Sequence, residues 1–403
     1  MKMNPLKSLI SIEEAHKIIG NSIKPISEVE YIDILELEGR VSAEDIISPM
    51  DVPPFRRASM DGFAIKSSDT FNASAENPIL LECIDIIQAG DVPKKEIKSG
   101  ECVQIATGAM VPNSADSVIQ VELTELINGK VQIISPIAPG TNISKAGIDL
   151  KKGEIVVRKG DVFTPGKIGA LASINKTSVL VYKKPRVAII PTGNEIAKLG
   201  SSLKEGQVYD INTYTIATLV KKNGGNPIIF DIIPDEIQKI ESAILKGLEY
   251  DIILLSGGSS VGERDLNIKI IQKYGKVLFH GVQIKPGKPT LYGLIKDKPI
   301  LNLPGYPTSC LTNSYIFLVP IIRKLGNLPP ERPRTIQAKL SKKIVSRLGR
   351  HQIYTVRLEN GYAIPVFKES GAITSIAWAD GYIEIPYNVD LLEKDEIVNV
   401  YLF

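Results

Sequence analysis

The sequence predicts an α/β protein of several domains, built on a doubly wound parallel sheet with smaller β domains attached. Two observations lead to this prediction. After Pro185, short apolar runs alternate with helical patterns, and the links between them are short. From Ile79 to Ile134, in contrast, short alternating runs are separated by turns, which is typical of a small antiparallel β domain.

Composition narrows the functional classes before any motif is considered. The 403 residues are 43% hydrophobic, enough for about two to four domains with real cores. A net charge of +3 is too balanced to favour a nucleic acid or an anionic membrane as partner. No run approaches the ~18 apolar residues of a membrane span, and acidic residues occupy the place of a signal-peptide core. We therefore expect a soluble, cytoplasmic protein.

Cysteines and histidines argue against a disulfide framework and against a transition-metal site. The three cysteines (Cys83, Cys102 and Cys310) are odd in number and far apart in the sequence, which suits a reducing compartment. Only three histidines are present, so a histidine-rich metal site is not expected.

The first segments of the chain carry clear local signals. Ser11 and Glu14 form a capping-box pattern that opens an amphipathic helix. A proline at position 165, directly after Thr164, marks the start of a later helix. The expected elements are helices over 11–23 and 165–172, strands over 31–37, 81–87, 102–105, 117–121, 130–134 and 178–182, an extended or short helical element over 39–47, and a hairpin over 154–163.

Three polar residues in this half of the chain lie in turn sequences. Prolines stiffen the segment 51–65 and would hold Asp61 in place, but an Asp-Gly turn between strands is the simpler interpretation. Thr107 lies in a small-residue loop after a strand, and Asp149 precedes the hairpin. Either residue is as ordinary in a turn as in a binding site.

The second half of the chain has the alternating order of a parallel α/β sheet. A helix capped by Asp210 or Asn212 ends at Asn223. The expected strands cover 186–190, 227–232, 252–255, 277–284 and 299–303, and the further helices cover 236–248, 266–274 and 309–325.

The run 252–255 is the expected centre of this sheet, because a short continuous apolar run must be buried on both faces. Ser256, Gly257 and Gly258 end the strand, and adjacent glycines can turn backbone N–H groups toward an anion. Asp265 follows, just before the next helix. Together these are parts of a phosphate-and-metal site, although a tight turn with a helix-capping Asp explains the same residues equally well.

Ligands of open α/β sheets bind beyond the carboxyl ends of the strands. Each expected strand here ends in glycine or proline together with a polar group. Carboxylates there suit Mg²⁺, while glycine amides and lysines suit phosphate or another tetrahedral oxyanion. The strand-end segments are 191–195, 234–236, 256–265, 285–289 and 304–309.

Other nucleotide and nucleophile motifs are missing from the sequence. No Gly-x-x-x-x-Gly-Lys-Ser/Thr loop exists, no G-x-G-x-x-G opens a helix after a strand, and no Ser/His/Asp arrangement is apparent. These absences argue against a P-loop NTPase, a dinucleotide-binding fold and a serine hydrolase.

Five short motifs occur in order along nearly the whole chain. They are Ser-Met-Asp-Gly-Phe-Ala (59–64), Pro-Thr-Gly-Asn-Glu (191–195), Ser-Gly-Gly-Ser-Ser-Val-Gly-Glu-Arg-Asp (256–265), Lys-Pro-Gly-Lys-Pro (285–289) and Leu-Pro-Gly-Tyr-Pro-Thr-Ser (303–309). Each is weak alone, but together the chain resembles the molybdopterin molybdenumtransferases, the family of the MoeA proteins and the E domain of gephyrin.

The resemblance implies an L-shaped homodimer that acts on small molecules. The family reaction takes adenylylated molybdopterin and molybdate, cleaves the adenylate in a Mg²⁺-dependent step, releases AMP and places the metal on the dithiolene sulfurs. Transient contact with the molybdopterin adenylyltransferase is a further expectation. The implied domains are an α/β domain of the MoaB/MogA type (1–25 and 180–326), an α/β linker domain (26–45 and 141–179), a β domain (46–140) and a C-terminal β domain (327–403).

By position, the resemblance also implies site residues, with Asp61 and Thr107 expected to complete the site of the other subunit. Asp235 and Asp265 are the expected Mg²⁺ ligands, with Glu195 as a further candidate. The implied catalytic residues are Asp61, Glu195, Asp235 and Asp265. The implied substrate-binding residues are Thr107, Asp149, Thr192, Gly193, Ser256, Gly257, Gly258, Lys285, Lys288, Pro289, Ser309 and Ser375, with Lys285, Lys288, Ser309 and Ser375 on the molybdate side.

Two departures from the family pattern concern the oxyanion side. Gly281 stands where some members have a lysine, and Thr355 aligns with the family's arginine unless Arg357 substitutes from the same face. The expected C-terminal β domain has alternating runs at 353–358 and 382–386, and we expect Trp378 in its core.

Two alternative functions remain open at this level. The related adenylyltransferase shares the α/β motif, but it would not need the segment that contains Asp61 or a C-terminal domain. A non-catalytic molybdopterin-binding scaffold would keep the fold without needing the carboxylates Asp61, Asp235 and Asp265. Molybdate and tungstate are tetrahedral dianions of nearly equal size, so the sequence does not choose between them.

Overall fold

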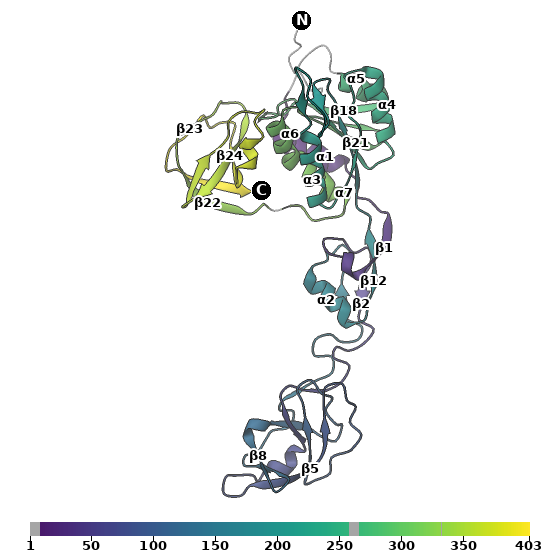
Figure 1. The fold of residues 1–403 in the computed structure, drawn as a ribbon, viewed down its shortest axis with the longest axis vertical. Helices are drawn as coiled ribbons and strands as arrows, with labels where there is room; N and C mark the ends of the chain where they lie inside the picture. Colours follow the sequence, from purple (N-terminus) through teal and green to yellow (C-terminus); the bar gives the residue numbers. More distant parts are fainter. Residues whose placement is uncertain (1–8, 258–265, 332) are drawn as a thin grey trace. The chain divides into compact units, whose positions relative to one another are not determined.

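The computed structural model describes residues 9–257, 266–331 and 333–403, and the chain divides into two compact units (Figure 1). The chain passes between the units within strands β1 (Val29–Asp33) and β12 (Ser178–Tyr182), and again on either side of Gly39–Val41. No helix of the described residues has the length and apolar character needed to cross a membrane. Unit 1 comprises Met1–Glu30, Gly39–Val41 and Val181–Phe403, and unit 2 comprises Tyr31–Glu38 and Ser42–Leu180.

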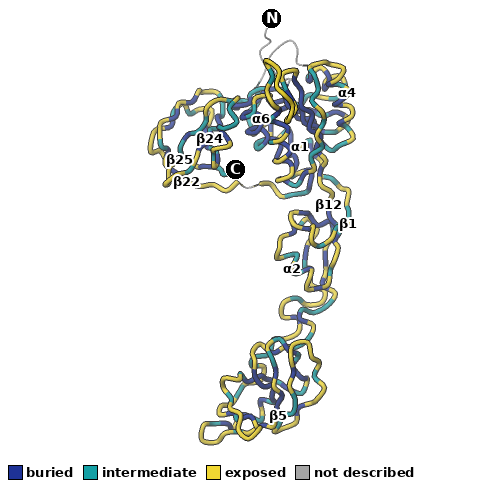
Figure 2. The backbone as a smooth tube through the Cα atoms, viewed as in Figure 1, coloured by how far each residue is buried: buried dark blue, intermediate teal, exposed yellow. Residues whose placement is uncertain are grey.

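Unit 1 is built on a six-stranded sheet with the order β16-β13-β17-β21-β20-β18. The first four strands are parallel, and every residue of the central strand β17 is buried, as its continuous apolar run predicts. Strands β13 and β21 are buried at every position but the first, whereas the edge strand β16 has no buried residue. Figure 2 shows buried residues in dark blue within both units. Their bounds are β13 (Arg186–Pro191), β16 (Asn226–Ile229), β17 (Ile252–Ser256), β18 (Gly275–His280), β20 (Leu291–Ile295) and β21 (Lys298–Leu303).

Strand β20 is absent from the sequence-based prediction, and it is antiparallel to both of its neighbours. It joins β21 through Lys296 and Asp297, which have φ values of 49° and 62°. Two adjacent left-handed residues make a tight hairpin turn, but such turns usually contain Asn or Gly, so the sequence does not predict this one. Position 293 within the strand requires glycine, because an added Cβ would lie 2.5 Å from the carbonyl oxygen of Lys276 on β18.

Helices cover both faces of the sheet, so the doubly wound arrangement is confirmed. One apolar cluster packs residues of α1, α3 and α7 against one face, and a second packs α4 and α5 against the other. Ser11 caps α1 by accepting a hydrogen bond from the Glu14 amide, as the capping-box pattern predicts. The helices are α1 (Ile12–Ser22), α3 (Asn212–Lys222), α4 (Ile237–Gly247), α5 (Leu266–Tyr274), α6 (Pro307–Asn313), a π-helical turn (Ser314–Leu318) and α7 (Val319–Leu325).

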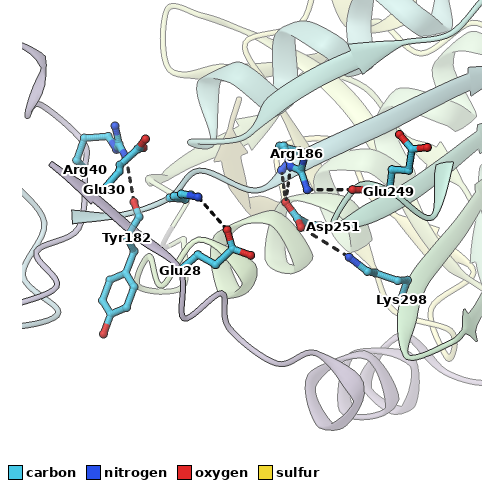
Figure 3. Close-up of polar contacts among 9 residues, drawn as sticks. Glu28, Glu30, Arg40, Tyr182, Arg186, Glu249, Asp251 and Lys298 are labelled. Atoms are coloured by element: carbon cyan, nitrogen blue, oxygen red, sulfur yellow. Dashed lines mark hydrogen bonds and ion pairs between the residues drawn. The ribbon is translucent and has the colours of Figure 1, made fainter. Parts of the chain in front are cut away.

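Charges at the amino edge of the sheet are paired with one another (Figure 3). Asp251 accepts a hydrogen bond from the Arg186 amide and lies 3.6 Å from its side-chain Nε and 3.9 Å from Lys298 Nζ. Arg40 donates to the Glu30 carboxylate and to the Tyr182 carbonyl. These charged groups at the amino edge are therefore paired within the protein.

The C-terminal part of unit 1 is a small β barrel. Strands β24, β25, β22, β28 and β26 pair in order, and the β24–β26 pairing closes the ring. Strand β19, from the loop after β18, adds in parallel to β24. The bounds are β19 (Ile284–Lys285), β22 (Thr335–Leu340), β23 (Ile344–Val345), β24 (His351–Glu359), β25 (Tyr362–Pro365), α8 (Thr374–Ala377), β26 (Gly381–Ile385), β27 (Leu391–Leu392) and β28 (Ile397–Leu402).

Unit 2 contains the predicted β domain, whose sheet has the order β7-β4-β6-β5-β9-β8. The sheet is mixed and not purely antiparallel, because β5 and β6 run parallel. This pairing places Cys83 directly opposite Cys102, and both remain free thiols. The bounds are β4 (Gly62–Ile65), β5 (Ile79–Ile87), β6 (Glu101–Ile105), β7 (Ser117–Gln120), β8 (Thr124–Ile127) and β9 (Lys130–Ile133).

The remaining elements of unit 2 correct two expectations. The strand expected over 31–37 ends at Asp33, whose side chain accepts a hydrogen bond from the Leu35 amide and opens a 3₁₀ turn. The expected hairpin over 154–163 is instead β11 (Ile155–Val157) paired with β2 (Ile46–Ile47). The other elements are β3 (Arg57–Ala58), β10 (Ile143–Ser144) and α2 (Pro165–Ser173), while the pair β14 (Ile196–Ala197) and β15 (Val208–Tyr209) belongs to unit 1.

Candidate functional site

The carboxyl edge of the unit 1 sheet is lined by backbone where β13 and β17 end. The Thr192 amide donates to the Ser256 carbonyl at 3.0 Å. Gly257 has φ of +111°, and an added Cβ would lie 2.3 Å from the Thr192 carbonyl oxygen. The ideal Cβ position of Gly305 lies only 3.6 Å from Gly257 Cα. Glycine is therefore required at position 257, and the two glycines leave the end of the central strand uncovered by side chains.

Two exposed carboxylates flank this edge. Glu195 folds back over Gly193, because a Cβ added to Gly193 would meet both carboxylate oxygens at 2.8 Å. The neighbouring Asn194 side chain accepts a hydrogen bond from the Asp235 amide at 3.2 Å, which joins the two loops. Neither Glu195 nor Asp235 forms an ion pair with a described residue. Both carboxylates are therefore available to a ligand.

The amino end of α3 contributes polar groups that the sequence-based prediction treated only as helix caps. Asp210 is buried and accepts a hydrogen bond from the Thr213 amide, as expected of a cap. Asn212 donates its amide to the Gly305 carbonyl at 2.8 Å, while its buried Oδ1 has no partner among the described residues. A pair of polar residues before a helix is too common a signal to identify such a role from sequence.

The Lys285–Pro289 loop is held by α6. Asn313, which is fully buried, donates to the Gly287 carbonyl at 2.9 Å and to Thr290 Oγ1 at 2.6 Å. Gly287 has φ of +104°, and an added Cβ would lie 1.9 Å from Asn313 Nδ2. Ser309 precedes Asn313 by one helical turn and is buried. Lys285, Lys288 and Pro289 are half-buried.

The barrel reaches the same region through the segment before α8. Thr308, next to Ser309, donates its hydroxyl to the Ala372 carbonyl at 2.7 Å and its amide to the Ser370 carbonyl at 3.0 Å. Ser375 is fully buried, and its hydroxyl accepts a hydrogen bond from the Lys368 amide at 3.0 Å. The structure therefore gives the Ser375 side chain a role in holding this turn.

The expectation that Trp378 lies in the barrel core is wrong. Its side chain is 58% exposed, and the Lys368 ammonium group stands 4.3 Å from the centre of its ring. The cation–π contact and the short α8 leave the indole at the surface.

The two departures from the family pattern have different surroundings. Gly281 is buried and has φ of +99°, a conformation that disfavours any other residue. Thr355 is 1% exposed, and its hydroxyl has no partner among the described residues. Arg357 lies two residues further along the same face of β24, but it is half exposed and pairs with Glu359 at 2.8 Å.

In unit 2, the structure brings Asp61 and Thr107 together. The Asp61 carboxylate accepts hydrogen bonds from the Thr107 amide at 2.6 Å and from its hydroxyl at 2.7 Å. These bonds, the amide first, lower the pKa of Asp61 below its usual range although the group is exposed. Asp61 lies in the bend between β3 and β4, as the turn interpretation expects, and Gly62 begins β4. Asp149 is exposed, and its amide donates to the Val52 carbonyl.

Two predicted site residues, Gly258 and Asp265, lie outside the described residues. Within the described part of the chain, no three acidic, histidine or cysteine side chains come close enough to hold a metal. The carboxylates of Glu195 and Asp235 nevertheless fit Mg²⁺, which usually binds one or two carboxylates and completes its shell with water and substrate phosphates.

The fold and this edge define a multidomain α/β protein, in which a doubly wound module with a glycine-lined carboxyl edge carries attached β domains. Residues 10–175 match the MoeA N-terminal region (domain I and II), residues 188–324 match a probable molybdopterin binding domain, and residues 337–403 match the MoeA C-terminal region (domain IV). The chain belongs to the MoeA family.

Relatives and solved structures agree with this membership over the whole chain. A Methanocaldococcus jannaschii protein named for molybdopterin biosynthesis is 36% identical over 99% of this chain and 100% of its own. The Bacillus subtilis molybdopterin molybdenumtransferase is 34% identical over 98% of this chain and 94% of its own. A crystal structure of the MoeA protein from Pyrococcus horikoshii has a TM-score of 0.86 at 40% identity, covering 98% of this chain and 99% of that one.

Proposed function

We propose that this protein is a molybdopterin molybdenumtransferase, which uses adenylylated molybdopterin and molybdate or tungstate and releases AMP. The observation that carries the proposal is the match over nearly the full chain to curated molybdenumtransferases, in all three family regions. The glycine-lined end of β17 supports it, because a backbone edge without side chains suits a phosphate group.

The proposed roles follow the chemistry of each group. Glu195 and Asp235 would hold Mg²⁺, which supplies positive charge beside the adenylate phosphate when bound. Lys285 and Lys288 would attract the oxyanion, and the Asn313 contacts keep their loop in one conformation. Asp265 and Gly258 are proposed to join this site from the segment after β17.

We further propose a cytoplasmic homodimer. Asp61 would then act together with Thr107 in a site completed by a second copy of the chain, and Asp149 is proposed to contribute there. A mixture of inactive Asp61→Asn and inactive Asp235→Asn proteins tests this arrangement. Shared sites predict partial recovery of AMP release on mixing, whereas no recovery above the separate variants would contradict it.

The decisive experiment measures AMP release from adenylylated molybdopterin by the purified full chain. We expect release that requires both Mg²⁺ and molybdate or tungstate, and parallel titrations of the two anions show which one is preferred. Asp235→Asn and Glu195→Gln should lower the rate by about 100-fold or more. Glu249→Gln, an exposed carboxylate at the opposite edge of the sheet, is the matched control and should keep full activity.

The outcomes also separate the alternative functions. Formation of adenylylated molybdopterin from ATP, without oxyanion-dependent AMP release, would identify an adenylyltransferase. Binding of molybdopterin or AMP without any turnover would identify a scaffold. Either result would overturn the proposed transferase activity.

A further inference from the structure

The resemblance to the family predicts two cationic side chains on the oxyanion side of the proposed site, and this chain has neither at those positions. Gly281 carries no side chain, and the buried hydroxyl of Thr355 is neutral. Arg357 is half exposed and already pairs with Glu359. A tetrahedral dianion needs several cationic or N–H donors, so other groups must stand beside Lys285 if it binds here.

Strand pairing brings a different arginine alongside Lys285. In the parallel pair of β19 and β24, Ile284 lies opposite His351 and Lys285 lies opposite Gln352. The His351 amide donates to the Gln283 carbonyl at 2.8 Å, which is a regular hydrogen bond of this parallel pair. Arg350 immediately precedes β24 and is two residues before Gln352, which lies opposite Lys285. The pairing of β19 with β24 therefore places Arg350 close to Lys285.

The turn before β24 is fixed by hydrogen bonds at three points. The Ser346 hydroxyl donates to Gln352 Oε1 at 3.0 Å, and its amide donates to the Asp390 carbonyl at 2.8 Å. The Gly349 amide donates to the Tyr387 carbonyl at 2.8 Å. Because the backbone of this turn is held on both sides, Arg347 and Arg350 are presented from a defined position.

The electrostatics agree with this placement. Burial first, and then the positive charges of Arg347 and Arg350, lower the pKa of Lys285. Neither arginine side chain makes an ion pair or a hydrogen bond with a described residue. At the amino edge of the same unit, by contrast, the cations Arg186 and Lys298 share Asp251. Like charges held together without an acid favour a bound anion.

We propose that Arg350, assisted by Arg347, supplies the cationic side of the oxyanion site in this chain, in place of the family positions occupied by Gly281 and Thr355. The bound group is a tetrahedral dianion of the molybdate or tungstate class. The guanidinium of Arg350 would donate two N–H groups to it, beside the ammonium of Lys285. This inference rests on the proposed function, because it extends the same site.

The test is calorimetric binding of molybdate to the full chain, alone and with AMP present. Arg350→Gln should weaken binding by about tenfold or more, the effect expected for a lost charge-assisted hydrogen bond, and Arg347→Gln should weaken it less. Arg350→Lys keeps the charge without the planar fork and should recover part of the affinity. Arg357→Gln, on the adjoining strand β24 and paired with Glu359, is the control and should bind as the unchanged protein does.

Each outcome decides the inference. It is overturned if Arg350→Gln and Arg347→Gln bind molybdate normally, if Arg357→Gln weakens binding as much, or if the unchanged protein binds no molybdate in either condition. AMP release, measured on the unchanged protein, keeps the two proposals apart. If molybdate binding depends on Arg350 but no AMP is released, this inference stands and the proposed function is overturned. If AMP release is normal but molybdate binding does not depend on Arg350, the proposed function stands and this inference is overturned.

Discussion

Replacing Gly287 by alanine should destabilise unit 1 strongly, because the added methyl group has no space. Its position lies 1.9 Å from Nδ2 of Asn313, which is buried and donates to the Gly287 carbonyl and to Thr290 Oγ1. A left-handed φ of +104° costs alanine about 1–2 kcal/mol. Moving Asn313 leaves buried polar groups without partners, at about 1–3 kcal/mol for each broken bond. With two such bonds, we expect a total loss of about 3–8 kcal/mol in the free energy of unfolding.

Urea unfolding followed by tryptophan fluorescence measures this loss, because the single tryptophan, Trp378, lies in unit 1. Gly361→Ala is the matched control in the same unit. Gly361 also has a left-handed φ, +80°, but nothing lies within 4 Å of its added Cβ. The control should lose only the conformational part, about 1–2 kcal/mol. Equal unfolding free energies for the two variants would refute the assignment of Asn313 as the constraint on this loop.

Three further predictions concern both units. Gly62→Ala should separate β4 from β7, since its Cβ would lie 1.8 Å from the Ile119 carbonyl oxygen. We expect the free energy of unfolding of unit 2, measured in urea, to fall by about 2–4 kcal/mol. The control Gly169→Ala on α2, with open space around it, should be neutral or stabilising. Thr107→Val should raise the pKa of Asp61 toward the usual range, as followed by NMR, while the amide hydrogen bond keeps part of the shift; an unchanged titration would contradict the hydroxyl contact. Because folding lowers this pKa, the hydrogen bonds stabilise the protein above the ordinary carboxyl pKa. That stabilisation is lost as pH falls through the lowered value. Molybdate affinity should fall as pH rises through the lowered pKa of Lys285, and Arg350→Gln should move that midpoint upward; a midpoint that stays in place would show that Arg350 does not act on Lys285.

The hydrophobic pattern was sufficient for the parts of the fold where one period dominates. The run 252–255 is apolar on both faces and became the buried centre of the parallel sheet. Ser11 and Glu14 predicted the start of α1 because a capping box is a local interaction. Strand β20 was missed because its interior contains Gly293 and its hairpin turn contains Lys296 in place of the usual Asn or Gly.

The site was predictable only to the level of motifs. Gly257 was expected from sequence, and the structure gives the reason, a carbonyl oxygen where a Cβ would be; the constraint on Gly287, the Asn313 amide group, was not expected. Asn313, Asn212 and Arg350 carried no recognisable signal, because each acts through a partner distant in the sequence: Gly287, Gly305 and the strand of Lys285.

The sequence by itself determined the order of the elements, the family and the residue types at the strand ends, because these depend on local periodicity and on short motifs. Only the tertiary structure decided which of those residues meet. Pairing of β19 with β24 sets Lys285 opposite Gln352, two residues from Arg350, and pairing of β5 with β6 sets Cys83 opposite Cys102. Long-range strand register has no local signature, since it is fixed by which buried faces pack together and not by neighbours along the chain.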